Sequence, residues 1–390
     1  MSASFEMTAK TFFGFEEILA TELRNLGAER VNIGNRIVSF YGDKGFMYKA
    51  NLCLRTALKI LKPIATQRVK NQEQLYKFVR SIDWSEFMEV TDTLAIFATV
   101  NTDNFNHSKF VALKCKDAIV DQFRDKTGER PSIDTEHPDL TVSIHIGGDH
   151  CTVSLDSSGA SLHHRGYRTA TNIAPINEVL AAGLLLHSGW RGQSHFLDPM
   201  CGSGTMLIEA AMIACNMPAN LNRKEFAFEK WLDWDMDLFE KIESVVLKKV
   251  TDCHYDIIGF DKAPSAVQKA KDNVKNANLN EFIKISHEDF FKTQKEYEAE
   301  ENLHMVFNPP YGERIAINMP EFYGQVGDTL KKNYPGTEAW FITSDLEAIK
   351  YVGLRPSRKI KIFNGKLEAR LLNYKMDAGS KRAKFQKDKQ

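Results

Sequence analysis

From about Leu162 onward, the sequence alternates between segments typical of strands and segments typical of helices. The expected strands are 195–197, 257–260, 282–285, 303–307 and 339–343, and the expected helices are 205–215, 265–277 and 321–333. Such alternation implies right-handed crossovers between parallel strands, and therefore a doubly wound sheet. Near the end, 359–363 and 367–374 flank Asn364-Gly365, a strong hairpin signal. We therefore expect an α/β fold whose parallel sheet is closed by an antiparallel C-terminal hairpin.

The first part of the chain follows a different pattern. A strand at 4–9, a helix at 16–26 and a strand at 36–41 indicate a small α+β unit. An amphipathic stretch at 44–61, a strand at 94–100, a helix that Ser108 can cap and a hairpin at 140–155 indicate a second α+β module. Ser157-Ser158-Gly159 is typical of a linker. The expected boundaries are 1–44 and 45–156 for the two units, 157–168 for the linker, 169–378 for the α/β domain and 379–390 for a disordered basic tail.

Composition excludes several classes of protein. No apolar run approaches the roughly 20 residues of a membrane span, and the polar start of the chain lacks the profile of a signal peptide. The six cysteines are scattered, with no C-x-x-C pair and no spacing typical of zinc ligands. We therefore expect reduced thiols, a cytoplasmic location, no membrane partner and no structural metal. A monomer is the expected state, although no feature of the sequence determines it.

The formal net charge is zero, but the charge is unevenly distributed. Residues 350–390 hold thirteen Lys and Arg against three Asp and Glu, and residues 41–80 hold nine against two. Residues 225–261 hold four against ten. Two basic zones in a neutral chain fit the footprint of a polyanion such as RNA. Solvated faces and a frayed tail would give the same charge pattern.

The stretch Asn308-Pro309-Pro310-Tyr311 ends an apolar strand abruptly. The two prolines fix φ and remove two N–H donors, so the strand cannot continue. The Asn308 amide oxygen and the Pro309 carbonyl can then accept hydrogen bonds from an exocyclic amine, while Tyr311 stacks on the ring that carries it. A proline-rich turn with a core aromatic would have the same residues.

A second candidate site begins where the expected strand 195–197 ends. Asp198-Pro199-Met200-Cys201-Gly202-Ser203-Gly204-Thr205 places an acid, a glycine turn and a helix start in succession. The glycines let a ligand approach the backbone, and the helix start presents free N–H groups. The third glycine of the dinucleotide fingerprint would fall at Leu207, so that fingerprint is absent. Cys201 has the position of a nucleophile, although a small space-filling residue is the favoured interpretation.

Two more acids follow the next expected strands. Asp261 ends the second strand, where it could accept both hydroxyls of a ribose, and 218–253 must then be an insertion. Asp289 follows the third strand and could accept from an adenine amino group. Taken singly, each is an ordinary loop acid. Together with Asp198 they would lie along the sheet edge where open α/β sheets bind ligands.

This order of motifs resembles the class I S-adenosylmethionine-dependent methyltransferases, which have a Rossmann-like fold. The Asn-Pro-Pro-Tyr motif is similar to that of the branch that methylates adenine N6 or guanine N2. The stretch 162–168 resembles the joint between a THUMP domain and its methyltransferase domain, and 45–156 is similar to THUMP, an RNA-binding module. The whole resembles the RlmL-type 23S rRNA guanine-N2 methyltransferases, preceded by a ferredoxin-like N-terminal region.

The resemblance implies a role for each motif. The catalytic residues are Asn308, Pro309, Pro310 and Tyr311, which hold and stack the target base. The residues that bind S-adenosylmethionine are Pro175 (in a motif before the first strand), Asp198, Pro199, Cys201, Gly202, Gly204, Thr205, Asp261, Asp289 and Asn308. No metal is needed, because the sulfonium methyl is already activated. The implied partner is RNA, either 23S rRNA or a large-subunit precursor.

Three alternatives remain open at this stage. Close relatives with the same parts methylate guanine N2 in tRNA. An N6-adenine methyltransferase acting on DNA or RNA would share every catalytic motif. A non-catalytic RNA-binding protein with a vestigial cofactor fold would be expected to lose Asn308 or the glycines, and both are intact.

Overall fold

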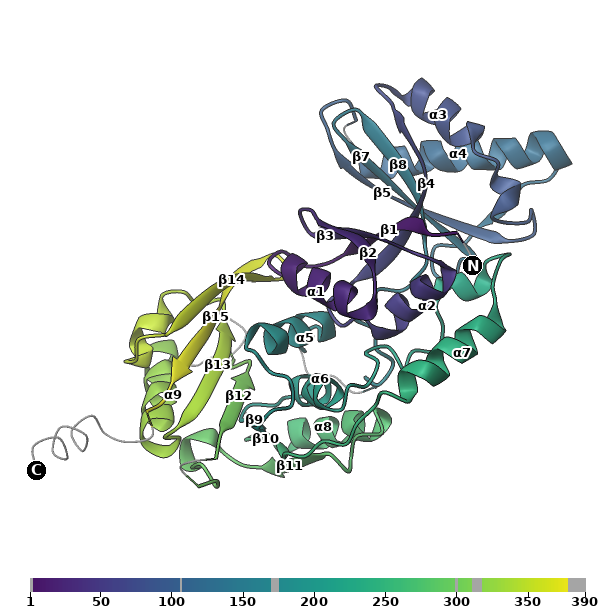
Figure 1. The fold of residues 1–390 in the computed structure, drawn as a ribbon. Coiled ribbons are helices and arrows are strands. Elements are labelled where there is room, and N and C mark those ends of the chain that lie inside the picture. Colours follow the sequence, from purple (N-terminus) through teal and green to yellow (C-terminus); the bar gives the residue numbers. More distant parts are fainter. Residues whose placement is uncertain (1–2, 106, 170–174, 299–300, 311–317, 378–390) are drawn as a thin grey trace, which may run out of the picture. The chain divides into compact units, whose positions relative to one another are not determined.

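The computed structural model describes residues 3–105, 107–169, 175–298, 301–310 and 318–377 (Figure 1). The chain folds into two compact units, which are described separately. Unit 1 comprises Met1–Thr11, Leu19–Leu162 and Arg223–Val245, and unit 2 comprises Phe12–Ile18, His163–Asn222 and Val246–Gln390. No helix within the described ranges is long and apolar enough to cross a membrane.

Unit 1 is built on a single sheet with the strand order β2-β3-β1-β4-β8-β7-β5-β6. Its strands are β1 (Phe5–Lys10), β2 (Glu29–Ile33), β3 (Ile37–Gly42), β4 (Lys59–Arg68), β5 (Thr93–Asn101), β6 (Ser132–Ile133), β7 (Leu140–Gly147) and β8 (His150–Asp156). Strand β4 pairs antiparallel with both β1 and β8, so the two α+β regions expected from the sequence share one sheet. The expected hairpin at 140–155 is confirmed as β7 and β8.

The amphipathic stretch expected at 44–61 is only partly helical. Helix α2 (Lys44–Cys53) ends there, and strand β4 begins at Lys59. This strand contains Pro63, and its register with β8 shifts between Pro63 and Ala65. The shift interrupts the alternation of polar and apolar residues, which is why the sequence did not indicate a strand.

The helices of unit 1 bury apolar residues against the sheet. They are α1 (Glu16–Leu26, from Leu19 onward), α2, α3 (Gln72–Ser81), α4 (Ser108–Thr127), the short η1 (Trp84–Glu86) and two later elements, η2 (Ala227–Lys230) and α7 (Met236–Leu247, through Val245). Helices α3 and α4 lie side by side (Figure 1). Ser108 is the first residue of α4 rather than its cap; His107 holds the cap position and makes no side-chain capping bond.

The segment expected as an insertion in the α/β domain supplies part of the unit 1 core. Phe226, Phe228 and Trp231 are buried there, and Phe228 stacks on Tyr48 with ring centroids 4.5 Å apart. The first residue of the expected linker is packed against unit 1, because the Ser157 hydroxyl is buried and donates to Ile60 O at 2.7 Å. Unit 1 therefore includes 223–245 of the expected insertion and the expected linker as far as Leu162.

Unit 2 contains the expected α/β sheet, with the strand order β11-β10-β9-β12-β13-β15-β14. Its strands are β9 (His195–Asp198), β10 (Ile257–Asp261), β11 (Ile283–His287), β12 (Leu303–Phe307), β13 (Thr337–Thr343), β14 (Arg358–Asn364) and β15 (Leu367–Lys375). Strands β9 to β13 pair in parallel, and the β14–β15 hairpin joins β13 antiparallel. The predicted doubly wound sheet with a closing hairpin is confirmed.

Helices pack on this sheet with largely apolar surfaces. They are α5 (Glu178–His187), α6 (Thr205–Ala214), α8 (Pro264–Asn276), α9 (Met319–Asn333) and the short η3 (Phe290–Lys292) and η4 (Ala348–Val352). Helix α6 is buried from Thr205 to Ile213 and packs against β9 and β10. At Gly259 an added Cβ would lie 2.2 Å from Leu207 Cδ1, so the Leu207 side chain of α6 packs into space that this glycine of β10 leaves open.

Candidate active site

The polar residues predicted for the site follow four adjacent strands of unit 2. Asp198 ends β9, Asp261 ends β10, Asp289 lies two residues beyond β11 and Asn308 directly follows β12. Because these strands run in parallel in the order β11-β10-β9-β12, all four residues lie at one edge of the sheet. The chain reverses its winding direction between β9 and β12, which is where open α/β sheets bind ligands.

The glycine loop connects β9 to α6 with two left-handed residues. Gly202 has φ +55° and Gly204 has φ +83°, values that L side chains rarely adopt. Gly204 caps α6 without a side-chain hydrogen bond, so the helix start is open to an external acceptor. An added Cβ at Gly204 would lie 3.2 Å from Ala270 Cβ, because the loop packs closely on α8.

Asp198 is a buried acid, with 2% of its surface exposed. Its Oδ1 accepts the Met200 N–H at 3.1 Å. Burial, reinforced by the nearby charge of Asp261, raises the pKa of Asp198 to about 8. A cationic ligand group beside this carboxyl would offset both effects, and the ammonium of a methionine moiety is such a group. The residue therefore fits the methionine end of S-adenosylmethionine.

The pKa of Asp198 leads to a prediction about stability. A carboxyl whose folded pKa is raised destabilises the fold above its unfolded pKa, and the cost grows until the folded pKa is reached. Asp198→Asn removes this charge and keeps the oxygen that accepts from Met200. We therefore expect Asp198→Asn to unfold at a higher temperature than the wild type, with a larger difference at pH 8 than at pH 5. Thermal melts at both pH values measure this, and a difference that shrinks as pH rises would contradict it.

Asp261 ties the glycine loop to the end of β10. Its Oδ2 accepts the Gly202 N–H at 3.0 Å, and its Oδ1 accepts the Ala263 N–H at 2.9 Å. A carboxylate oxygen has a second lone pair, so both oxygens can still accept from ribose hydroxyls. Asp289 instead caps η3, where its Oδ1 accepts the Phe291 N–H at 3.1 Å. Asp289 is half-buried, and it too retains accepting capacity for an adenine amino group.

Asn308 holds a buried acceptor that has no partner among the described residues. Its Oδ1 is buried and makes no hydrogen bond to any residue that the structure describes. A buried amide oxygen left unpaired costs free energy, so such an atom points to a ligand that completes it. Pro309 is buried and Pro310 is half-buried beside it, while Tyr311 lies outside the described residues. The orphaned oxygen fits the expectation that Asn308 accepts from an amine of the substrate.

Cys201 does not have the properties of a nucleophile. It is 6% exposed, and its N–H donates to Phe260 O at 3.0 Å. Burial and the nearby acids Asp198 and Asp261 raise the pKa of its thiol well above the usual value, so the reactive thiolate is disfavoured. The interpretation of Cys201 as a small space-filling residue therefore fits the structure.

Two residues that sequence reasoning did not select hold the glycine loop in place. The Arg168 guanidinium donates to Glu178 Oε1 at 2.8 Å and to Thr205 Oγ1 at 2.9 Å, at the starts of α5 and α6. Asn273 on α8 donates from Nδ2 to Ser203 O at 3.0 Å. Only the position of Arg168 in the 162–168 motif could have indicated it; Asn273 looks like an ordinary helix-surface residue in the sequence.

The segment containing Pro175 leads into α5. Pro175 is exposed, and Asn177 caps the helix by accepting the N–H groups of Val179 at 2.9 Å and Leu180 at 3.1 Å. Arg168 also donates to Ile176 O at 2.9 Å, so this segment and the glycine loop share one guanidinium. Residues 170–174, which precede Pro175, are outside the described ranges.

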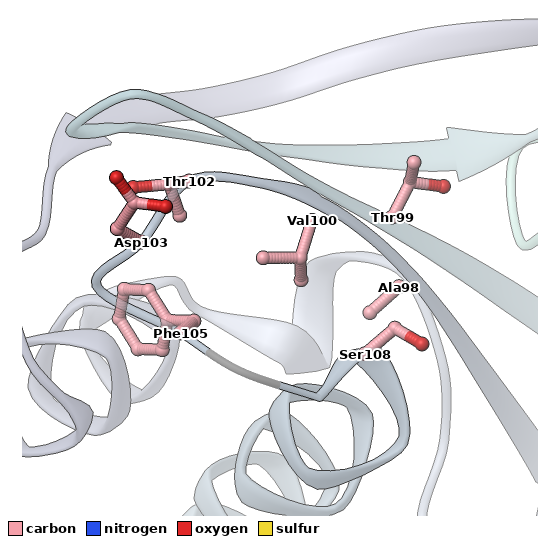
Figure 2. Close-up of a pocket in the computed structure, with 7 residues that line it drawn as sticks. All are labelled: Ala98, Thr99, Val100, Thr102, Asp103, Phe105 and Ser108. Carbon is pink, nitrogen blue, oxygen red and sulfur yellow. The ribbon is translucent and has the colours of Figure 1, made fainter.

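A hollow in unit 1 lies apart from this edge of the sheet. Among the described residues, no group of three His, Cys, Asp or Glu side chains could hold a metal ion. The hollow has a volume of about 510 Å³ and lies between the end of β5 and the start of α4 (Figure 2). It is lined by Ala98, Thr99, Val100, Thr102, Asp103, Phe105 and Ser108.

Comparison with known families covers most of the chain. Residues 165–373, more than half of its length, match the family described as "RMKL-like, methyltransferase domain". Residues 69–156 match the THUMP domain, and residues 6–61 match the RlmL ferredoxin-like domain. All three families agree with the resemblance drawn from the motifs.

Curated relatives match nearly the whole chain. A Synechocystis protein named "Putative RNA methyltransferase" is 37% identical over 383 residues, which cover 96% of this chain and 99% of that protein. The ribosomal RNA large subunit methyltransferase K/L of Syntrophotalea carbinolica is 38% identical over 389 residues, covering 96% of this chain and 54% of the relative. The chain thus spans about half the length of the K/L relatives that it matches.

A solved structure has the same fold. The crystal structure of SMU.472, described as "a putative methyltransferase complexed with SAH", superposes with a TM-score of 0.86 at 28% identity. The match covers 97% of this chain and 99% of that one. The ligand there is S-adenosylhomocysteine, the product that S-adenosylmethionine leaves after methyl transfer.

Proposed function

This chain belongs to the family of RMKL-like methyltransferase domains, and we propose that it transfers methyl from S-adenosylmethionine to the exocyclic N2 amine of a guanine in 23S rRNA or its precursor. The proposal includes a cytoplasmic location, a monomeric enzyme, no metal requirement and the domain boundaries expected from the sequence. Support for the RNA substrate comes from the THUMP match and from the names of the relatives. Support for an amine as methyl acceptor comes from the buried Asn308 oxygen, which has no hydrogen-bond partner among residues 301–310 or elsewhere in the described ranges.

The residues of the chain would promote transfer mainly by positioning. S-adenosylmethionine, when bound, supplies an activated methyl group on a sulfonium. Asn308 Oδ1 and the Pro309 carbonyl would accept the two hydrogens of the target amine, which turns its lone pair away from the conjugated ring. The same two oxygens would stabilise the positive charge that develops on the nitrogen. The base must leave a helix or lie in a single-stranded loop to reach the edge of the sheet.

We predict that Asp261→Ala weakens the binding of S-adenosylmethionine by about 1–3 kcal/mol, the cost of leaving buried partners unpaired. The variant loses both the proposed ribose acceptor and the bond that holds Gly202. Asp256→Ala is the matched control, because Asp256 precedes the same strand at its opposite end and binds Lys284 at 2.7 Å. Isothermal titration calorimetry without RNA measures both, and an unchanged affinity in Asp261→Ala would rule out the ribose role.

A second prediction concerns the basic zones. Arg68 is exposed over 72% of its side chain, and Lys70 is exposed, so both can reach RNA phosphates. The other zone is partly neutralised, since Glu368 pairs with Lys361 at 2.9 Å and with Arg370 at 2.7 Å. Charge reversal at Arg68 and Lys70 should therefore make RNA affinity less dependent on salt. The change in slope should correspond to the loss of about one to two phosphate contacts.

The matched control reverses two exposed lysines of α8, Lys271 and Lys275, which lie outside both zones. Fluorescence anisotropy of labelled RNA between low and high salt gives the slope for each variant. Equal slopes for the wild type and the Arg68/Lys70 variant would contradict the prediction and show that these residues belong to an ordinary solvated surface.

A further inference from the structure

Cys215 and Cys253 lie close together in unit 2, although the chain between them leaves that unit. Cys215 is the residue that caps the end of α6, and Cys253 lies in the segment that leads into β10. Between them, Arg223–Val245 belongs to unit 1. One cysteine is therefore on the chain that leaves unit 2, and the other is on the chain that returns to it.

Two hydrogen bonds hold the returning chain against the end of α6. The Thr251 N–H donates to Cys215 O at 2.9 Å, and Asn216 Nδ2 donates to Lys249 O at 3.0 Å. A disulfide forms only between cysteines whose backbones already lie close together, because its bond lengths and dihedral angle leave little freedom. The contacts of 249–251 with the end of α6 supply this proximity.

The two thiols are also hydrogen-bonded to each other. Burial, the nearby charge of Cys253 and a hydrogen bond with Cys253 raise the pKa of Cys215 to about 12. A hydrogen bond raises the pKa of an acid when it holds the acid's own proton, so the Cys215 thiol donates to Cys253. The Cys253 thiol in turn donates to Tyr255 O at 3.2 Å. The proton of Cys215 thus points toward the sulfur of Cys253.

The two sulfurs differ in their access to solvent. Cys253 is partly exposed, whereas Cys215 is 0% exposed. An oxidant dissolved in water therefore reaches Cys253 first, with the buried thiol beside it. Redox-sensitive sites combine an accessible cysteine with a neighbouring cysteine that reacts with the first oxidation product. The proposed methyl transfer uses neither thiol.

Another pair of neighbouring cysteines lies in unit 1 and lacks this access. Cys115 on α4 and Cys151 on β8 are both 0% exposed. They are close enough that the charge of Cys151 adds to the effect of burial in raising the pKa of Cys115. This pair is a matched control within the same chain, because it has two neighbouring sulfurs but no accessible one.

We propose that Cys215 and Cys253 are a site of reversible oxidation by peroxides, and that their disulfide holds the end of α6 to the chain that leads into β10. First, the Cys253 sulfur attacks one oxygen of hydrogen peroxide, the O–O bond breaks, and the leaving hydroxide takes the thiol proton to give water and a sulfenic acid. The Cys215 sulfur then attacks that of Cys253, the S–O bond breaks, and the hydroxyl leaves with the Cys215 proton as water. Each sulfur loses one electron and the peroxide gains two. A thiol reductant reverses the change.

The disulfide joins two elements that already meet at the candidate active site. Helix α6 begins at the glycine loop, and β10 ends at Asp261, which accepts the Gly202 N–H at 3.0 Å. The cysteines lie toward the opposite ends of the same two elements. Closing the loop 215–253 also restricts the unfolded chain. Helix α6 therefore opens less readily in the oxidised protein than in the reduced protein.

The first test maps the oxidation products of the full chain. The protein is treated with hydrogen peroxide and dimedone, blocked with N-ethylmaleimide in denaturant, digested without reductant and analysed by mass spectrometry. We expect a peptide that joins Cys215 to Cys253, and blocked thiols at Cys115 and Cys151. In Cys215→Ala, where the partner is missing, dimedone should label Cys253. If Cys215 and Cys253 both stay thiols in the wild type, or if Cys253 carries dimedone without being joined to Cys215, the proposal is overturned.

Hydrogen exchange of peptides from 205–214 measures the effect on α6. Exchange should be at least about 10-fold slower in the oxidised wild type than after reduction with dithiothreitol. Peroxide should leave the exchange of Cys253→Ser unchanged. Cys53→Ser is the control, because it removes a partly exposed cysteine of unit 1, and it should respond like the wild type. Equal exchange in the oxidised and reduced wild type, or a response that persists in Cys253→Ser, would contradict the proposal. Neither test involves RNA or methyl transfer, so its outcome is independent of the proposed function.

Discussion

Replacing Asn308 by alanine should slow methyl transfer by about 100-fold or more while leaving the affinity for S-adenosylmethionine nearly intact. The side chain follows β12 at the edge of the sheet, and its buried Oδ1 has no hydrogen-bond partner in the described part of the chain. An acceptor aimed at charge that develops during the reaction stabilises the transition state more than the bound substrate. Its removal should therefore act on the chemical step.

Single-turnover transfer from tritiated cofactor to RNA measures this rate apart from product release. Asn32→Ala is the control, because Asn32 is exposed on β2, in unit 1, and its side chain donates to Arg30 O at 3.2 Å. It should react at the wild-type rate. Calorimetry on Asn308→Ala should show wild-type cofactor affinity. A wild-type rate in Asn308→Ala would mean that Asn-Pro-Pro-Tyr is only a turn.

Arg165→Met should destabilise unit 2 by about 3–5 kcal/mol, the cost of leaving a buried charge without its partner. The side chains of Arg165 and Glu209 are both 0% exposed, with Nε and Oε1 3.3 Å apart. Tyr167 donates to the same carboxylate at 3.0 Å, and Asn220 accepts from Arg165 at 3.0 Å. The network fixes α6, which carries the glycine loop at its start.

Hydrogen exchange of peptides from 205–214 reports the free energy at which α6 opens, separately from unit 1. The double variant Arg165→Met with Glu209→Leu should recover much of the loss, since it removes the orphaned charge. Lys332→Met is the control, because its partner Asp328 is exposed and their pair is on the surface. Equal protection of α6 in Arg165→Met and the wild type would show that the buried pair is not what holds the helix.

The fold of unit 2 was predictable because its signals are local. Apolar strands followed by Asp198, Asp261 and Asn308 define the sheet edge, and Asn364-Gly365 defines the hairpin. The orientation of these residues toward one edge follows from parallel pairing alone. The polar side chains could therefore be placed together from the sequence alone.

The features that the sequence did not predict depend on contacts between residues that lie far apart in the chain. Strand β4 carries Pro63 and a register shift, so its pairing with both β1 and β8 has no local signature. The assignment of 223–245 to unit 1 depends on packing such as the stacking of Phe228 on Tyr48. The support of the glycine loop by Asn273 depends on a helix 70 residues away in the chain. The lack of a partner for Asn308 Oδ1 within the described part of the chain is likewise a property of the packed site.

We propose that this chain methylates the N2 amine of guanine in RNA. The most direct measurement incubates the purified chain and S-adenosylmethionine with 23S rRNA from a strain that lacks the gene, and digests the RNA to nucleosides for mass spectrometry. Transfer RNA and DNA from the same strain serve as parallel substrates. We expect N2-methylguanosine to increase in 23S rRNA and not to increase when Asn308→Ala replaces the wild type. Formation of N6-methyladenine, methylation confined to tRNA or DNA, or no new methylated nucleoside in any substrate would contradict the claim.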